Sequence, residues 1–252
     1  MKYTDNFGCV VVSFLVHVSL TLVNSVQANN GVWIVVPAYN EGPRLAASLE
    51  ALTQQYANIV MVDDGSSDET GQVAGEYAVH RVTHLINRGQ GAAIRTGLDY
   101  ALSRGAEAMV TFDADGQHAV EDIEKIASPI LAGEVDVTLG SRFLGETHGM
   151  PRGRRIILKA GVLFTRTFSR IRVTDTHNGL RGFSRPAALA IRITEDDYTH
   201  ASEILDEIFR RKLIFREVPV RIRYSASTLA KGQTNWNALR IVGRILMGRL
   251  FR

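Results

Sequence analysis

The chain has 252 residues, of which 45% are hydrophobic and 22% charged, with 22 glycines and 6 prolines. These proportions are those of an ordinary globular domain, so they exclude an intrinsically disordered chain and a collagen-like repeat. No apolar run after residue 30 approaches the roughly 20 residues that a spanning helix needs, which excludes a polytopic membrane protein. The single cysteine, Cys9, excludes a disulfide framework and a cysteine-based zinc site, and it favours a reducing compartment.

Basic and acidic residues are segregated along the chain, although the net charge is only +3. The segments 142–172 and 219–252 together hold 15 Arg or Lys residues and a single acid, Glu146. The remainder holds 14 basic and 25 acidic residues. This distribution predicts two basic surfaces that face an anionic partner, which is nucleic acid, phospholipid or a phosphorylated substrate.

The first 30 residues form a segment of uncertain status. Residues 9–23 are mostly apolar but short for a membrane span, and residues 26–28 read Val-Gln-Ala, which resembles a signal-peptidase site. Lys2 is the only basic residue ahead of this stretch and Asp5 offsets its charge, so a cleaved signal peptide is the less favoured interpretation. A membrane anchor and an incorrectly assigned start of translation remain as alternatives.

From Val32 onward, short β-branched runs alternate with longer helical patterns, which is typical of an α/β fold with a mostly parallel central sheet flanked by helices. The patterns predict strands at 32–36, 59–63, 79–84, 108–112 and 136–140, and helices at 43–56, 68–77, 91–104 and 119–131. In the second half they predict an Arg-rich helix at 152–171, a Gly-containing stretch at 175–184, helices at 186–192 and 199–211, and a strand at 213–223. We therefore expect one catalytic domain over 31–234, followed by a basic amphipathic helix over 235–252.

Polar residues follow the first two predicted strands at their carboxyl ends, where ligands bind in open α/β sheets. The first strand ends in VVPAYNEG, which includes Tyr39 and Glu41, and the second runs into VDDGSSDET. A carboxylate such as Asp64 can accept the imide or amine hydrogens of a nucleotide base. Helix capping, for example by Asn40, is an equally simple interpretation of either motif.

A Gly-rich turn at residues 87–91 precedes a helix that carries Arg95. Turns of this kind at helix N-termini can present N–H groups to phosphate. The chain contains no GxxxxGK[ST] sequence, which excludes phosphoryl transfer of the P-loop type.

The strongest local signal is TFDADGQH at the end of the predicted strand 108–112. Asp113 and Asp115 stand two residues apart in a strand-to-loop turn, so both carboxylates can converge on one hard cation, with Gln117 beside them. Oxygen ligands of this kind suit Mg²⁺ or Mn²⁺ bridging the phosphates of a substrate. An EF-hand calcium loop is excluded because Gly116 stands at its fourth position, not its sixth, and because a strand precedes it.

These motifs, in this order, resemble the family 2 glycosyltransferases of GT-A fold, and most closely the dolichyl-phosphate and polyprenyl-phosphate sugar transferases. The resemblance covers about residues 32–235 through VVPAYNE, VDDGSSDET, NRGQGAAIRTG, FDADGQH, GSRF, DTHNGLRGFSR, ASEI and EVPVRIRY…KGQ. It implies a metal-dependent inverting hexosyltransferase with a UDP- or GDP-linked sugar donor, and an arginine, Arg142, that faces phosphate. The nucleotide-sugar contacts that it implies are Pro37, Tyr39, Glu41, Val62, Asp64, Asp113, Ala114, Asp115, Gln117 and Lys231, with Asp113, Asp115 and Gln117 as the metal ligands.

The nature of the acceptor decides whether a general base is needed. A hydroxyl acceptor requires one, and Asp175 and Glu203 are the candidates, although each is also placed to cap a turn or a helix. A lipid phosphate is already anionic, so it needs only basic residues that hold it in position.

The helix 152–171 favours the lipid, because its basic residues fall within an arc of about 60° beside an apolar face. These basic residues are Arg152, Arg155, Lys159, Arg166 and Arg170.

We therefore expect transfer to a polyprenyl phosphate, in cell-envelope polysaccharide synthesis, by an enzyme attached peripherally to the anionic cytoplasmic face of a membrane. A hydroxyl of a glycan or lipid-linked saccharide is the alternative acceptor, and an inert sugar-nucleotide-binding module is the alternative class. A nucleotidyltransferase normally has a long Gly-rich loop where this chain reads PAYNEG. No nucleic-acid partner is expected, because aromatic residues do not interleave the basic segments and such a module leaves the acidic pair unused.

Overall fold

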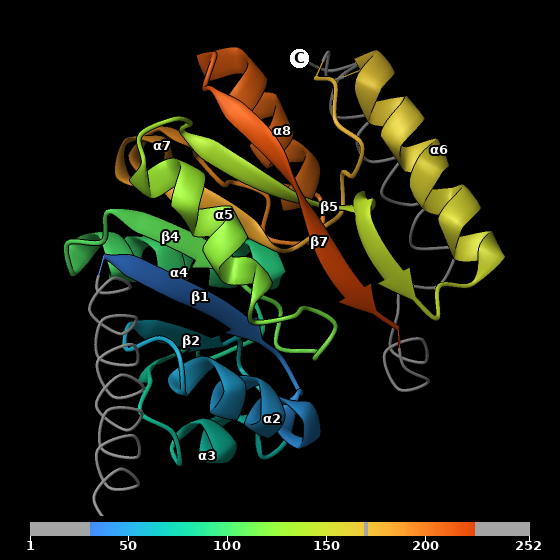
Figure 1. Ribbon diagram of the computed structural model, residues 1–252. Helices are drawn as coiled ribbons and strands as arrows, with labels where there is room; N and C mark the ends of the chain where they lie inside the picture. The colour runs from blue at the N-terminus through green and yellow to red at the C-terminus, as the bar shows by residue number, and fades with distance from the viewer. Residues whose placement is uncertain (1–30, 169–170, 225–252) are drawn as a thin grey trace, which may run out of the picture.

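A computed structural model describes residues 31–168 and 171–224 of the chain (Figure 1). The N-terminal segment 1–30, the predicted helix 235–252 and Lys231 lie outside the described residues. No helix in the described part of the chain combines the length and the apolar character that crossing a membrane requires.

The centre of the fold is a seven-stranded sheet of order β3-β2-β1-β4-β6-β5-β7. Its strands are β1 Val32–Ala38, β2 Ile59–Asp63, β3 His80–Thr83, β4 Ala108–Thr111, β5 Val137–His148, β6 Arg181–Ser184 and β7 Phe215–Arg223. All pairings are parallel except those of β6, which runs antiparallel to both β4 and β5. The mostly parallel sheet predicted from the sequence is therefore confirmed.

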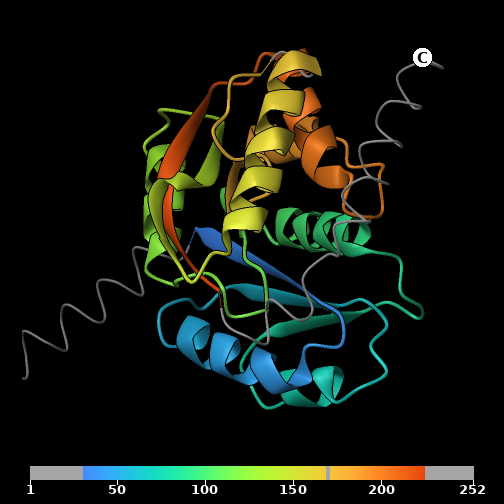
Figure 2. The same cartoon turned by 90° about the vertical axis from the view of Figure 1, so that its right-hand side faces the viewer.

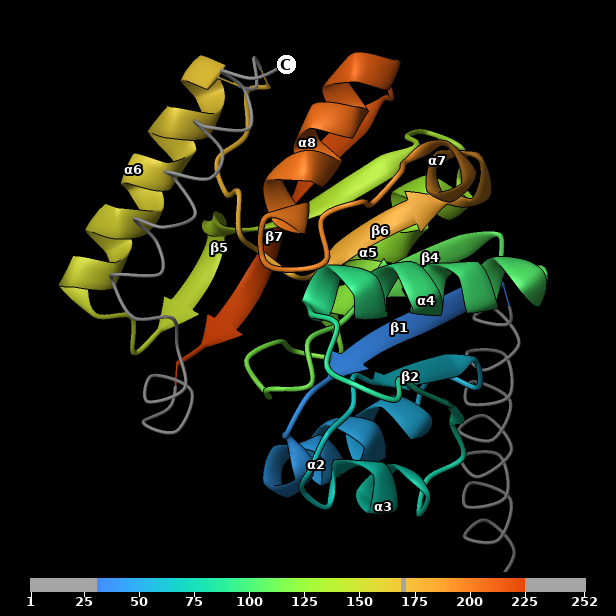
Figure 3. The same ribbon diagram turned by 180° about the vertical axis from the view of Figure 1, so that it is seen from behind.

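The helices cover both faces of the sheet. They are α2 Gly42–Thr53, α3 Thr70–Ala74, α4 Gln90–Ser103, α5 Asp122–Leu131, α6 Arg152–Phe168, α7 Arg185–Ala190 and α8 His200–Arg211. In Figure 1, α2, α3 and α5 lie in front of the sheet, and the view from behind in Figure 3 shows α4, α7 and α8 on the opposite face. Helix α6 stands apart, beside β5 and β7, and faces the viewer in Figure 2.

Two hydrophobic clusters, one on each face of the sheet, hold these layers together. Alternate residues of β1 belong to different clusters. Val32, Ile34 and Val36 pack on the side of α2 and α5, whereas Trp33 and Val35 pack on the side of α4 and α8. Successive side chains of a strand point to opposite faces, so a continuous apolar run fills both clusters. The strand is therefore buried along its whole length, and its carboxyl end is held at a fixed edge of the sheet.

Helix α3 is shorter than the predicted helix 68–77, and the structure differs most from the predicted elements in two other places. Strand β6 occupies the end of the stretch 175–184, where the sequence analysis predicts no strand. Strand β5 continues to His148, well beyond the predicted 136–140, after a shift in its register against β7 between Ser141 and Glu146. Both segments depend on pairing with strands distant in sequence, which local periodicity does not encode.

Candidate active site

A cavity of about 1230 Å³ opens where β1, β2 and β4 end. Its walls come from the loops after these strands, from one side of α6 and from the first turn of α8. Most of the sequence-predicted site residues line it, namely Pro37, Tyr39, Glu41, Asp64, Asp113, Ala114, Asp115, Gln117 and Arg142. Val62 is fully buried in the core beneath, and Asp175 and Glu203 are absent from the lining among the described residues.

The loops after β1 and β2 are fastened to each other by polar contacts. Asn40 has a φ of 52°, a left-handed conformation that asparagine tolerates, and its side chain accepts a hydrogen bond from the Ser67 N–H at 2.9 Å. The Asn40 N–H in turn donates to Ser66 Oγ at 3.0 Å, and the Glu41 N–H donates to Thr70 Oγ1 at 2.9 Å. These contacts hold the exposed ring of Tyr39 at the mouth of the cavity.

The Gly-rich turn at 87–91 binds a carboxylate of the protein itself. The N–H groups of Arg88 and Gly89 donate to Asp64 at 3.0 and 2.7 Å, and the Gly91 N–H donates to the Asp196 carbonyl at 2.8 Å. Arg95 is also paired within the protein, because its guanidinium lies 2.9 Å from the Asp196 carboxylate. The N–H groups of Arg88, Gly89 and Gly91 therefore hold Asp64 and the 193–197 segment in place and are not available to a phosphate.

The acidic pair lies directly after β4 and is supported on several sides. Asp113 accepts hydrogen bonds from Gln90 Nε2 at 2.9 Å and from His118 Nε2 at 3.2 Å. Both oxygens of Asp115 accept from Gln117, from its N–H at 3.0 Å and from its Nε2 at 2.6 Å. The side chains that the motif TFDADGQH places in sequence order thus converge on one wall of the cavity.

The electrostatics of this pair fit a divalent cation. Burial and the neighbouring Asp113 charge raise the pKa of Asp115, so a cation beside both carboxylates relieves an unfavourable arrangement. Among the described residues, no group of three or more His, Cys, Asp or Glu side chains is arranged to hold a metal. Mg²⁺ sites often use one or two carboxylates, with phosphate oxygens and water completing the coordination, so the acidic pair suits such a site.

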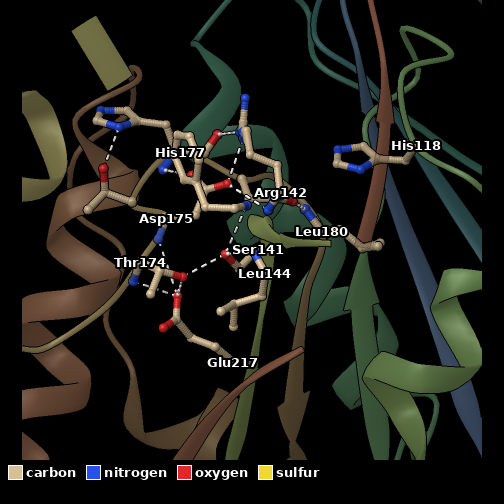
Figure 4. A network of polar contacts seen from close by, with 12 residues as sticks. His118, Ser141, Arg142, Leu144, Thr174, Asp175, His177, Leu180 and Glu217 are labelled. Carbon is tan, nitrogen blue, oxygen red and sulfur yellow. Dashed lines mark hydrogen bonds and ion pairs between the residues drawn. The ribbon is translucent and has the colours of Figure 1, made fainter. Parts of the chain in front are cut away.

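Arg142, on the far wall, belongs to a connected polar network (Figure 4). Its Nε donates to Asp175 at 2.6 Å, its Nη1 to the Tyr224 hydroxyl at 2.6 Å and its Nη2 to the His177 carbonyl at 3.0 Å. Burial opposes the charge, but Asp175 and Tyr224 raise the pKa of the guanidinium, so Arg142 stays charged. Glu217 on β7 supports the network from outside the cavity by accepting from the Asp175 N–H at 3.2 Å.

Neither candidate base is placed to take a proton from a substrate. Asp175 has a side chain only 1% exposed and uses Oδ2 to bind Arg142. Glu203 accepts from the N–H groups of Thr194 and Glu195 at about 3 Å, and so fastens the loop before α8. These contacts favour positioning roles for both carboxylates.

Comparison with known proteins identifies the family. The sequence matches the model described as Glycosyl transferase family 2 over residues 33–192. The chain belongs to glycosyl transferase family 2. It is 32% identical over 243 residues to the UDP-N-acetylglucosamine--dolichyl-phosphate N-acetylglucosaminyltransferase of Methanococcus voltae, covering 88% of this chain and 97% of that protein. It is 28% identical to the undecaprenyl-phosphate mannosyltransferase of Micrococcus luteus, covering 74% and 81% of the two chains.

Solved structures show the same fold for this family 2 glycosyltransferase. Glucosyl-3-phosphoglycerate synthase from Mycobacterium tuberculosis, in complex with uridine diphosphate, superposes with a TM-score of 0.68 at 16% identity. The superposition covers 88% of this chain and 80% of the synthase. Together with the family assignment, it confirms the predicted GT-A fold.

Helix α6 contributes a basic residue that the sequence analysis did not assign to the site. Arg154 lines the cavity, its guanidinium lies over the Tyr224 ring at 5.5 Å from the ring centroid, and its Nε has no hydrogen-bond partner among the described residues. The residues His177, Asn178 and His200 also line the cavity without having been assigned. Their only signal was their position in DTHNGLRGFSR and directly before ASEI.

Proposed function

We propose that this family 2 glycosyltransferase moves a sugar from a UDP- or GDP-linked donor to a polyprenyl phosphate. One observation carries the proposal: a single cavity joins an acidic pair, Asp113 and Asp115, to the guanidinium groups of Arg142 and Arg154. The first pair suits a metal-bound diphosphate, and the second suits the phosphate of an acceptor. Relatives named as dolichyl-phosphate and undecaprenyl-phosphate sugar transferases support this acceptor class.

The donor side would use Asp113, Asp115 and Gln117 to hold Mg²⁺ or Mn²⁺. When bound, the cation neutralises the negative charge that grows on the leaving diphosphate as the bond to the sugar breaks. Structures of glucosyl-3-phosphoglycerate synthase with Mn²⁺ and uridine diphosphate support this choice of cofactor. Pro37, Tyr39, Glu41 and Asp64 would receive the nucleoside, because they line the end of the cavity formed by β1 and β2.

The acceptor side would work without a general base. Among the described residues, partners take three of the five N–H donors of Arg142, so two are available to a phosphate, and Arg154 supplies a second cation. A phosphate oxygen guided by these groups would attack the sugar from the side opposite the diphosphate, which gives inversion at the reacting carbon. The committed hydrogen bonds of Asp175 and Glu203 fit this scheme, because a phosphate acceptor has no proton that must be removed.

Helix α6 would bring this side of the cavity to the cytoplasmic face of a membrane. Its outer surface exposes the basic residues Arg152, Arg155 and Lys159 together with Ile156, which is 69% exposed, and Leu163, which is 67% exposed. A helix that exposes both cations and apolar side chains suits an anionic lipid surface. Peripheral attachment through α6 would thus place Arg154, on the inner side of the same helix, next to a lipid phosphate.

The test is transfer of label from UDP-glucose, UDP-N-acetylglucosamine and GDP-mannose to detergent-dispersed undecaprenyl and dolichyl phosphates. We expect label from one donor to enter the organic phase in the presence of Mn²⁺, and we expect EDTA or Asp115→Asn to abolish it. Asp99→Asn on the exposed side of α4 is the matched control and should retain full activity. Label that remained in the aqueous phase with every lipid acceptor would contradict the polyprenyl phosphate and favour a glycan hydroxyl.

A further inference from the structure

Two short segments, 177–179 and 200–202, line the cavity between the acidic pair and Arg142, and the proposed function leaves them unassigned. The first segment touches both ends of the reaction path. The His177 carbonyl accepts from Arg142, and a Cβ on Gly179 would lie 2.0 Å from Asp113 Oδ2. Asn178 lies between these two contacts. A sugar that moves from a metal-bound diphosphate to a phosphate on Arg142 therefore has to pass beside it.

Asn178 carries an unused hydrogen-bond donor. The residue is only 3% exposed, and its Oδ1 accepts from the Leu180 N–H at 2.9 Å. Its Nδ2 is buried and has no partner among the described residues. A buried amide N–H without a partner is rare in folded proteins, which points to a ligand oxygen as its partner.

His200, at the start of α8, offers the complementary acceptor. Its Nδ1 lies 2.6 Å from the Asp197 carbonyl oxygen, and since a carbonyl can only accept, Nδ1 carries the proton. Burial and then the charge of Arg181 lower the pKa of His200 to about 4, so the ring is neutral near pH 7. In this tautomer Nε2 carries the lone pair that can accept a hydrogen bond from a hydroxyl.

Arg181 binds the two segments into one rigid unit. It is buried at the start of β6 and donates to the Asn178 carbonyl at 3.0 Å, to the Thr176 carbonyl at 3.1 Å and to the Ala201 carbonyl at 3.3 Å. A donor and an acceptor fixed in this way cannot adjust freely to a different ligand. Such preorganised groups discriminate between ligands better than mobile ones.

We infer that Asn178 and His200 bind hydroxyl or other oxygen groups of the transferred sugar and so determine which sugar the enzyme accepts. Asn178 Nδ2 donates to a sugar oxygen, and His200 Nε2 accepts from a sugar hydroxyl. Neutral groups suit this task because sugar hydroxyls are neutral, whereas the charged residues at either side bind phosphates. The inference rests on the proposed function for its sugar-nucleotide donor, but not on the identity of the acceptor.

The experiment combines enzyme variants with deoxygenated donors. Asn178→Ser keeps an oxygen for the Leu180 N–H and removes the amide donor, and His200→Asn keeps a donor for the Asp197 carbonyl and removes Nε2. Asn58→Ser, in the turn before β2 and outside the cavity lining, is the matched control. Binding of the nucleoside diphosphate and of its parent, 2-, 3-, 4- and 6-deoxy sugar conjugates is measured by calorimetry with Mn²⁺, and kcat/KM is measured for each donor.

We expect each variant to lose at least about 10-fold in affinity and kcat/KM for the parent donor, with affinity for the nucleoside diphosphate unchanged. For one deoxy donor, the variant and the wild type should agree within about threefold, because the contact is already missing. Equal losses for the parent and for every deoxy donor would overturn the inference. If sugar-dependent binding behaves as expected but no label reaches a lipid, the proposed acceptor fails and the inference stands.

Discussion

Replacing Gly179 by alanine tests whether the position of the Asp113 carboxylate controls transfer. A Cβ on Gly179 would lie 2.0 Å from Asp113 Oδ2 and 2.5 Å from its Cγ. Non-bonded heavy atoms pack at about 3.5 Å, so the carboxylate has to move by more than about 1 Å. The Gly179 backbone cannot easily move instead, because its carbonyl accepts from Thr111 Oγ1 at 2.6 Å.

The expected loss of activity follows from that displacement. A misplacement of about 1 Å in a catalytic constellation costs about 100-fold in rate, which corresponds to about 2.7 kcal/mol in the activation free energy. The free energy of unfolding should change little, because the Asp113 side chain can rotate and Gly179 does not adopt a left-handed φ. Alanine at this position should therefore lower the activity while the free energy of unfolding stays nearly the same.

The assay is kcat/KM for the preferred sugar nucleotide as a function of Mn²⁺ concentration, together with urea unfolding of the same samples. Gly153→Ala is the matched control, since no atom of the described residues lies within 4 Å of a Cβ at that position of α6. We expect Gly179→Ala to need more Mn²⁺ and to remain far below the wild type at saturation. If it kept kcat/KM within about threefold of the wild type with the same metal dependence, the reasoning about Asp113 would be refuted.

Three other predictions concern the acceptor side and pH. Asp175→Asn should raise the KM for polyprenyl phosphate about 10-fold or more, because an amide has one acceptor oxygen where the carboxylate uses two, for Arg142 Nε and for the His177 N–H, so Arg142 loses its position. A loss in kcat alone, with a changed pH profile, would indicate a general base. Charge reversal on the outer surface of α6 should weaken sedimentation with anionic liposomes at least about 100-fold, since each basic residue contributes about 1 kcal/mol, and unchanged sedimentation would contradict membrane attachment through this helix. The reversed residues are Arg152→Glu, Arg155→Glu and Lys159→Glu. Burial, and to a smaller extent nearby arginines, lower the pKa of His177 to about 4. The unfolded chain therefore binds a proton at this residue that the folded chain does not, so His177 should lower the free energy of unfolding by about 1.6 kcal/mol between pH 6.5 and pH 5. His200, whose pKa is also lowered to about 4, should contribute an equal fall, so His177→Gln should remove only its own part in urea titrations.

The donor half of the molecule could be predicted from the sequence because its signals are local. Each of β1, β2 and β4 is a short apolar run, and the polar motif that follows it comes to the same edge of the sheet. Parallel pairing alone brings these loops together, so Tyr39, Asp64 and Asp113 meet in one cavity as expected. The amphipathic helix α6 could be predicted for the same reason, because its pattern is also local.

What the sequence did not predict depends on partners far away in the chain. Asp175 was a candidate base until the structure paired it with Arg142, 33 residues earlier. The N–H groups of the Gly-rich turn could have faced a phosphate, but Asp64 on the neighbouring loop occupies two of them. Residue type and spacing show that a group can donate or accept, whereas only the tertiary fold shows whether another side chain has already taken that capacity.

The break in β5 has a consequence for how such a chain can diversify. Between Ser141 and Glu146 the strand shifts its register, and Gly145 lies so close to β7 that a Cβ there would be 2.2 Å from the Val220 carbonyl oxygen. Beyond the break, β5 and β7 continue as a two-stranded ribbon that leads into α6 (Figure 1). The ribbon also reaches the loop of the acidic pair, because the Arg223 N–H donates to the Gln117 carbonyl at 3.0 Å and Ile222 forms a bridge with His118. Substitutions or insertions in the outer part of β5 and in α6 should therefore alter the choice of acceptor while the donor preference is inherited unchanged, whereas changes at the end of β7 should affect both sides of the cavity.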